Sequence, residues 1–288
     1  MDIDIKIKEL DKMDYSSFVG LIKERNRPSG GIKTVQEVAI NTFLNENKKI
    51  LEIGSNTGFT TINLCLLTGC SGHGIDINDS SIEESNRLAN VHGIQDKVKF
   101  SKADATNLPF EDESFDIVWC SNVTSFIGDK QKAISEYLRV LKQNGTLVFV
   151  PIYYLEEPPK ELIREVSEAI ASKIEVYSKQ HWLNLIRKVL NETTNFDLEL
   201  YFNKDYRYLN VETEILDYIS KVLDKPHLKE KNIEYRDAVF KRAKYFMNLF
   251  NENLKYAGYS IFLFQKRREA EEVELFKTIE VFTKDEIK

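Results

Sequence analysis

The sequence has little of what marks fibrous, disulfide-rich or membrane proteins. Its 288 residues include six prolines, twelve glycines and three cysteines, which excludes collagen-like and low-complexity architectures. The cysteines are odd in number and form no C-x-x-C pair, which argues against a disulfide scaffold and a cysteine-rich zinc site. No apolar run nears the roughly 18 residues of a spanning helix, and the N-terminus lacks a signal-peptide core. We therefore expect a globular, cytoplasmic protein that does not insert into a membrane.

The chain also lacks an excess of positive charge. Its 46 acidic and 40 basic side chains give a net charge of −6, the wrong sign for binding a phosphate backbone, so a nucleic-acid partner is disfavoured. Acidic residues gather in the tail at 268–288, where four apolar residues share one helical side: Leu275, Phe276, Ile279 and Phe282. We expect this tail to pack on its own or a neighbouring subunit, and the second arrangement would give a homodimer.

Between Lys48 and Pro151, short β-branched runs alternate with helical stretches, as in the βαβ units of a parallel sheet. The predicted strands are residues 48–53, 72–77, 98–103, 115–120 and 145–151, with two weaker ones at 192–202 and 257–267. The remaining segments, 1–46, 156–191 and 203–256, have helical spacing. We predict one doubly wound, Rossmann-like α/β domain with a seven-stranded sheet. Residues 47–155 would form its cofactor-binding core, and the helical segments would cap its carboxyl edge.

The most informative stretch, Leu51 to Gly58, places an acid and two glycines where the first strand meets its helix. Such a turn lets backbone N–H groups approach a ligand at a helix N-terminus. A dinucleotide fingerprint needs glycines at 54, 56 and 59, but this chain has Asn56 and Phe59. A dehydrogenase is therefore disfavoured. Asn56 can still keep the shape of the turn, because asparagine tolerates a positive φ.

Two acids follow at the ends of the next strands. Asp76 lies 22 residues after Gly54, where a carboxylate can bind the hydroxyls of a ribose. Asp104 ends the third strand, where a carboxylate can accept from an exocyclic amine. The fourth strand then ends at Ser121-Asn122. The ordered set is far more specific than any one of its members.

In this set the chain resembles the class I S-adenosylmethionine-dependent methyltransferases, in the group of ubiquinone-biosynthesis-type small-molecule enzymes. The resemblance covers residues 46–155 and returns weakly at 192–202 and 257–267. It implies S-adenosylmethionine as cofactor, held by Glu52, Gly54, Ser55, Asn56, Gly58, Asp76, Ile77, Asp104, Ala105, Ser121 and Asn122. The implied reaction is in-line methyl transfer to an oxygen, nitrogen or carbon nucleophile of a small molecule. The alternatives are a methyltransferase of a peptide or RNA, and a non-catalytic cofactor-binding module.

Methyl transfer from a sulfonium demands mainly the positioning of two reactants, so the sequence assigns no catalytic side chain. The weak candidates for a base or a substrate contact are His181, Tyr153 and Tyr154. Arg25 and Arg27, beside a hinge at Pro28, could clamp an anion, although solvated charge is the simpler interpretation. The histidines are scattered without H-x-x-x-H spacing, so no metal site is predicted.

Overall fold

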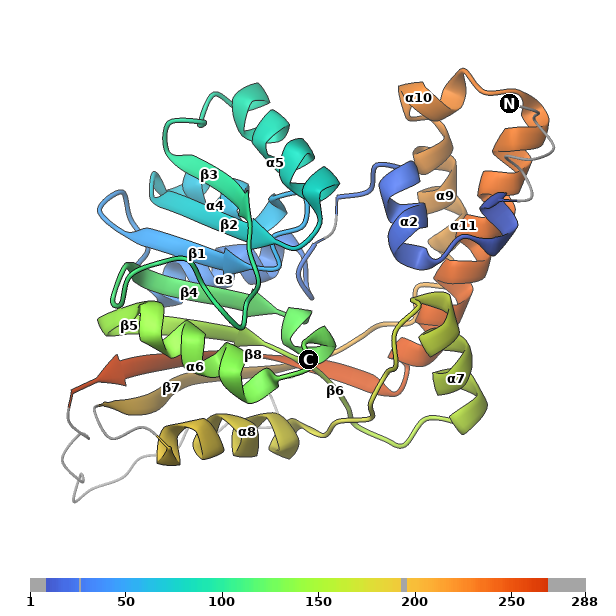
Figure 1. The fold of residues 1–288 in the computed structure, drawn as a ribbon. Helices are drawn as coiled ribbons and strands as arrows, with labels where there is room; N and C mark the ends of the chain where they lie inside the picture. The colour runs from blue at the N-terminus through green and yellow to red at the C-terminus, as the bar shows by residue number, and fades with distance from the viewer. Residues whose placement is uncertain (1–8, 26, 193–195, 269–288) are drawn as a thin grey trace, which may run out of the picture.

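The computed structural model describes residues 9–25, 27–192 and 196–268 (Figure 1). Over these residues, one sheet holds eight strands in the order β3-β2-β1-β4-β5-β8-β6, and β7 pairs with the other edge of β8. The strands are β1 (Lys49–Ile53), β2 (Ser71–Asp76), β3 (Val98–Lys102), β4 (Phe115–Ser121), β5 (Leu141–Val150), β6 (Ile152–Tyr154), β7 (Asp197–Arg207) and β8 (Ala257–Arg267). Strands β1 to β5 pair in parallel, whereas β8 is antiparallel to each of its partners. The predicted α/β fold class is confirmed.

The end of the sheet departs from the predicted boundaries in two ways. An extra short strand, β6, forms because β5 continues past Pro151, whose missing N–H interrupts the pairing with β8. The strand predicted at 192–202 is β7, which starts at Asp197 because helix α8 runs to Asn191. It also extends to Arg207, into the predicted second cap insertion, because β8 offers partners along its full length.

Helices cover both faces of the sheet. One face carries α3 (Ile32–Asn41), α4 (Phe59–Thr68) and α5 (Asp79–Val91), and the other carries α6 (Lys130–Val140) and α8 (Lys179–Asn191). Successive strand residues point to opposite faces, so Ile50 packs in the α3–α5 layer and Leu51 in the α6–α8 layer. The position of α8 corrects the prediction that 156–191 belongs wholly to a cap, because Trp182 and Ile186 bury that helix against the sheet.

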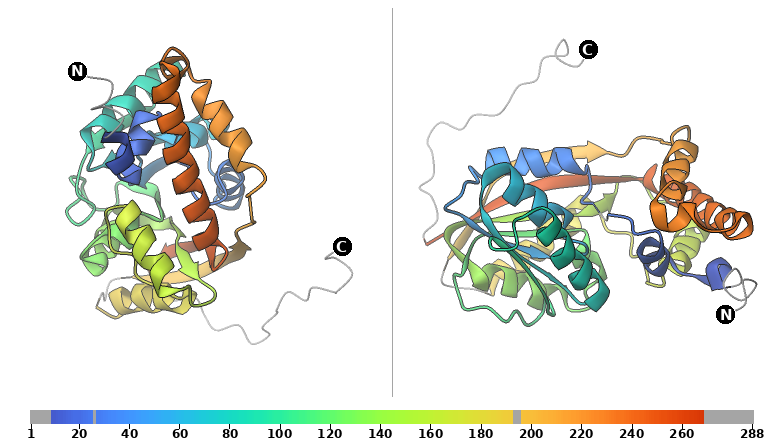
Figure 2. Two further views of the ribbon diagram at one scale, coloured as in Figure 1. Left: turned by 90° about the vertical axis from the view of Figure 1, so that its right-hand side faces the viewer. Right: turned by 90° about the horizontal axis from the view of Figure 1, so that it is seen from above.

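The remaining helices form a group with an apolar core of their own. They are α2 (Tyr15–Leu21), α7 (Lys160–Ala169), α9 (Ile215–Leu223), α10 (Pro226–Lys229) and α11 (Ile233–Leu254). Phe18, Ile219 and Phe246 are fully buried in that core. Figures 1 and 2 place this group at the end of the sheet where β8 begins, which is the carboxyl edge of the parallel strands. A hydrogen bond of 3.1 Å from the Tyr154 hydroxyl to Asn253 joins the two parts.

None of the helices in the described ranges is long and apolar enough to cross a bilayer. The predictions made for the acidic tail fall on residues 269–288, which lie outside those ranges.

Candidate active site

The turn between β1 and α4 contains three residues in the left-handed region. Gly54, Asn56 and Gly58 have φ values of 67°, 45° and 78°. Asn56 thus takes the backbone conformation expected of it, and its side-chain oxygen accepts a bond of 2.7 Å from the Thr57 N–H. The turn lies at the carboxyl edge because β1 ends there, between β2 and β4.

Both glycines are required by space as well as by φ. A Cβ atom at Gly54 would lie 2.5 Å from a methyl group of Val123, in the 3₁₀ turn η1 (Val123–Phe126) after β4. A Cβ atom at Gly58 would lie 2.6 Å from the ring of Phe100 on β3. The bare backbone of the turn therefore fits against a side chain of β3 and against the turn η1 that follows β4.

Glu52 braces this turn from beneath. It is 5% exposed, and one carboxylate oxygen accepts from both the N–H and the hydroxyl of Thr61 on α4, at 3.0 and 2.6 Å. Burial raises the pKa of Glu52 to about 7, although the bonds from Thr61 act in the opposite direction. Glu52 thus ties β1 to α4, and the structure gives it a bracing position under the turn.

Asp76, at the end of β2, is brought directly to the turn. Its carboxylate accepts from the Asn56 N–H and from the Asn78 N–H, at 2.9 Å each. An ionised carboxylate offers about four lone-pair sites, so two remain for a ligand. Its neighbour Ile77 is 72% exposed, so its side chain is free to contact a flat ring of a ligand.

Asp104 and Ala105 follow β3 beside this site, and the Ala103 N–H bonds the Asp76 carbonyl at 3.1 Å. The Asp104 carboxylate accepts from the N–H and hydroxyl of Thr106, both at 2.8 Å. The hydrogen bond from the Thr106 N–H is the main cause that lowers the pKa of Asp104, so the carboxyl group is ionised. Asp104 is exposed, and its remaining lone pairs face solvent. Ala105 is buried.

Ser121 and Asn122, at the end of β4, complete the predicted set. Asn122 has a φ of 60°, and its amide nitrogen donates to the Ser29 hydroxyl at 3.1 Å. That hydroxyl also lies 2.6 Å from the hydroxyl of Tyr208. Sequence reasoning missed Ser29 and Tyr208, because they are 93 and 179 residues from their partners in this cluster and carry no local motif.

Three hydroxyl groups in and beside the turn lack hydrogen-bond partners among the described residues. The hydroxyls of Ser55, Thr57 and Ser121 are buried and have no hydrogen-bond partner among the described residues. Leaving a buried polar group unpaired costs roughly 1–3 kcal/mol, so three at one sheet edge indicate a site that takes polar groups. The amino-acid part and ribose of S-adenosylmethionine offer such groups, so the residues present fit this cofactor.

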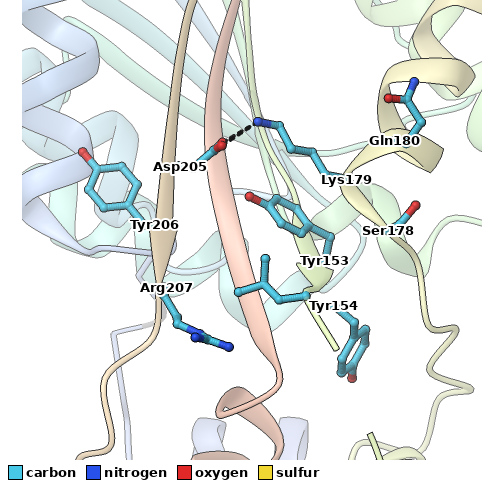
Figure 3. A pocket seen from close by; sticks show the side chains of 9 residues that line it. Tyr153, Tyr154, Ser178, Lys179, Gln180, Asp205, Tyr206 and Arg207 are labelled. Atoms are coloured by element: carbon cyan, nitrogen blue, oxygen red, sulfur yellow. Dashed lines mark hydrogen bonds and ion pairs between the residues drawn. The ribbon is translucent and has the colours of Figure 1, made fainter. Parts of the chain in front are cut away.

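The three residues predicted as a base or a substrate contact lie away from the turn at Gly54–Gly58. Tyr153 and Tyr154 belong to β6, beyond β5 in the sheet order, and line an open pocket of about 480 Å³ with Lys179, Asp205 and Arg207 (Figure 3). His181 is on α8, where its ring stacks on Tyr177 at 3.9 Å. Burial, with help from Lys130, lowers the pKa of His181, so the imidazole is neutral at pH 7.

The two arginines near the hinge differ in their surroundings. The Arg27 guanidinium lies 5.4 Å from the centre of the Phe59 ring, the first residue of α4, and so flanks the turn. Arg25 lies toward α5. The pKa of Glu84 on that helix is lowered mainly by its bond to Arg87, and the charge of Arg25 lowers it further from a longer distance. Within the described ranges, no three His, Cys, Asp or Glu side chains gather as a metal site would require.

Comparison with known proteins agrees with this geometry. A family described as a methyltransferase domain matches residues 44–194. An uncharacterised protein of Haemophilus influenzae is 31% identical over 62% of this chain and 71% of its own length. The ubiquinone/menaquinone biosynthesis C-methyltransferase UbiE of a Marinomonas species is 34% identical, over 43% of this chain and half of its own length. The crystal structure of the MccD protein superposes with a TM-score of 0.69 at 22% identity, covering 84% of this chain and all of that one. This chain belongs to the class I S-adenosylmethionine-dependent methyltransferases.

Proposed function

We propose that the protein transfers the methyl group of S-adenosylmethionine to an oxygen, nitrogen or carbon nucleophile of a small molecule. The observation that carries the proposal is the turn at Gly54–Gly58, with the unpartnered hydroxyls of Ser55, Thr57 and Ser121 around it. The cofactor, when bound, supplies a methyl group on a positively charged sulfur, which needs no further activation.

The residues at the turn would divide the binding between them. The N–H groups of the turn and the hydroxyls of Ser55 and Thr57 would hold the amino-acid part. Asp76 would accept from the ribose hydroxyls with its two remaining lone-pair sites. Asp104 would accept from the exocyclic amine of adenine, with Ile77 and Ala105 beside the ring.

Catalysis would then consist mainly of holding the nucleophile in line with the methyl group. Positioning of two reactants is worth up to roughly 7–11 kcal/mol, whereas a general base adds about 10²- to 10⁴-fold. The Asn122 amide, fixed by Ser29 at the end of β4, would border the reacting atoms. His181, Tyr153 and Tyr154 stay predictions as base or substrate contacts.

The setting of the reaction is part of the proposal. A cytoplasmic location is supported by the three cysteines, which are all buried and free. A small-molecule acceptor is supported by the relatives, because UbiE acts in ubiquinone and menaquinone biosynthesis by its name. A homodimer remains a proposal from the sequence of the acidic tail.

Calorimetric titration tests the proposal. We expect micromolar binding of S-adenosylmethionine and S-adenosylhomocysteine and no binding of NADH, because the turn lacks the glycines of a dinucleotide site. Screening of acceptors by mass spectrometry, for a gain of one methyl group, then distinguishes small molecules from peptides and RNA. Failure of both sulfur ligands to bind would remove the methyltransferase function and favour a different role for the fold.

A further inference from the structure

One exposed cation lies beside the turn between β1 and α4. The Arg27 guanidinium is 5.4 Å from the centre of the Phe59 ring, and among the described residues it has no carboxylate within ion-pair distance. The nearby acid Glu24 is already paired with Lys225 at 2.9 Å. Burial raises the pKa of Tyr218 on α9, and the charge of Arg27 acts in the opposite direction. Arg27 therefore holds an accessible positive charge between the turn and the helical cap.

The chain next to Arg27 is anchored at the end of β4. Ser29 is only 7% exposed, and its hydroxyl accepts from the Asn122 amide at 3.1 Å. Gly30 follows with a φ of 78°, and a Cβ atom there would clash with the Tyr259 hydroxyl on β8. These contacts fix the path of the segment that carries Arg27 along the carboxyl edge of the sheet.

The order of the strands sets the direction in which the cofactor would lie. Asp104 follows β3 and Asp76 follows β2, so the adenine and the ribose would lie over that end of the sheet. The next strands in the sheet order are β1 and β4, so the amino-acid part, on the other side of the ribose, would extend over them. Arg27 contacts the helix that follows β1, and Ser29 is bonded at the end of β4. Arg27 is thus placed at the amino-acid end of the ligand.

The backbone donors of the turn are already engaged. The N–H of Ser55 bonds a carbonyl of β2 at 2.8 Å, and that of Asn56 bonds the Asp76 carboxylate at 2.9 Å. The N–H of Thr57 bonds the Asn56 side chain at 2.7 Å, and that of Gly58 bonds the Ser55 carbonyl at 2.8 Å. These four groups can give a ligand carboxylate only a shared bond, so a strong donor has to come from outside the turn.

The charges at the turn lead to the same requirement. The carboxylate of Asp76 lies at the turn and repels a second carboxylate, so the anionic end of the ligand needs a cation. A guanidinium offers parallel N–H donors that match the two oxygens of a carboxylate, and such charge-assisted bonds are stronger than neutral ones.

We infer that Arg27 binds the carboxylate of the amino-acid part of S-adenosylmethionine. The inference rests on the proposed function, because it concerns a ligand of the same site. It assigns Arg27 a binding role from a segment that precedes the predicted cofactor-binding core.

Two ligands separate the amino-acid part from the rest of the molecule. S-adenosylhomocysteine carries the carboxylate, whereas 5′-methylthioadenosine keeps the adenine, the ribose and the sulfur but lacks the amino-acid part. Calorimetry measures the binding of each to the full chain. Arg27→Gln keeps a side chain of similar length without the charge. We expect it to bind S-adenosylhomocysteine about 10- to 100-fold more weakly and 5′-methylthioadenosine as tightly as the unchanged protein does.

Two further variants control for general effects of charge. Arg25→Gln is the matched control, because Arg25 is exposed on the same segment but lies toward Glu84 on α5, and both ligands should bind it unchanged. Arg27→Lys keeps the charge without the planar fork, so its loss of S-adenosylhomocysteine affinity should be smaller than that of Arg27→Gln. A loss as large as in Arg27→Gln would refute the ionic contact.

The outcomes separate this inference from the proposed function. If Arg27→Gln binds S-adenosylhomocysteine within about twofold of the unchanged protein, the inference is wrong and the methyltransferase function stands. An equal loss of both ligands would show that Arg27 acts on the adenosine or on the fold of its segment, and would also overturn the inference. Failure of the unchanged protein to bind S-adenosylhomocysteine would refute the proposed function and the inference together.

Discussion

Replacing Gly54 by alanine should damage the turn between β1 and α4 by two separable effects. The left-handed backbone at φ 67° costs an alanine about 1–2 kcal/mol. The new Cβ would also lie 2.5 Å from Val123 Cγ2 and 2.7 Å from Val123 Cβ. Because the Val123 Cβ cannot rotate away, η1 itself must shift, and overpacking of this kind costs typically about 1–3 kcal/mol. Together the free energy of unfolding should fall by about 2–5 kcal/mol.

Gly93→Ala is the matched control for the first effect. Gly93 has a φ of 68°, and a Cβ there meets nothing within 4 Å. The difference between the two variants, about 1–3 kcal/mol, therefore isolates the contact with Val123. Combining Gly54→Ala with Val123→Ala should recover only part of the loss, because the Val123 Cβ remains.

Urea unfolding followed by tryptophan fluorescence measures these differences, since Trp119 and Trp182 are both fully buried. Calorimetry with S-adenosylhomocysteine reports on the turn itself, and Gly54→Ala should bind at least tenfold more weakly than Gly93→Ala. If Gly54→Ala and Gly93→Ala unfold within about 0.5 kcal/mol of each other, the packing argument for the turn is wrong.

Three further predictions concern the same site. Burial raises the pKa of Glu52 to about 7, so the folded protein keeps a proton that the unfolded chain releases above about pH 4.5. Stability therefore falls as the pH rises to about 7, and Glu52→Gln should remove this loss of about 3 kcal/mol. An equal shift of the urea midpoint between pH 5 and 8 in both proteins would contradict this. Asp76→Ala should weaken binding of S-adenosylhomocysteine at least tenfold, whereas Asp79→Ala, which removes an exposed ion pair with Lys102, should not; calorimetry of folded variants decides. Tyr208→Phe should raise the dissociation constant of S-adenosylhomocysteine about 2- to 10-fold, because the hydrogen bond between Tyr208 and Ser29 is lost. Tyr206→Phe is the control and should leave the dissociation constant unchanged, because the Tyr206 hydroxyl bonds Glu37 instead. Equal effects of the two substitutions would contradict the role of Tyr208.

The residues that act through their nearest neighbours could be predicted from the sequence. Gly54 and Asn56 occupy a strand-to-helix turn, and their positive φ follows from residue type and local order. Asp76 follows β2, and parallel strands bring their carboxyl ends to one edge, so its place beside the turn was implied by the alternation of elements. The five parallel strands were located for the same reason.

Other features required the tertiary structure, because their partners are distant in the sequence. Ser29 and Tyr208 meet Asn122 from opposite ends of the chain, and hydrophobic periodicity carries no information about such meetings. The place of α8 was decided by burial of Trp182 against the sheet. The hydrogen bonds that join Tyr153 and Asp205 to Ser260 likewise form only because β6 and β7 pair with opposite edges of β8. Tyr153 and Ser260 are 107 positions apart in the sequence. The sequence by itself determined the turn at Gly54–Gly58, because its conformation depends on residue types that are adjacent in the chain. The pairing of distant strands decided what surrounds it.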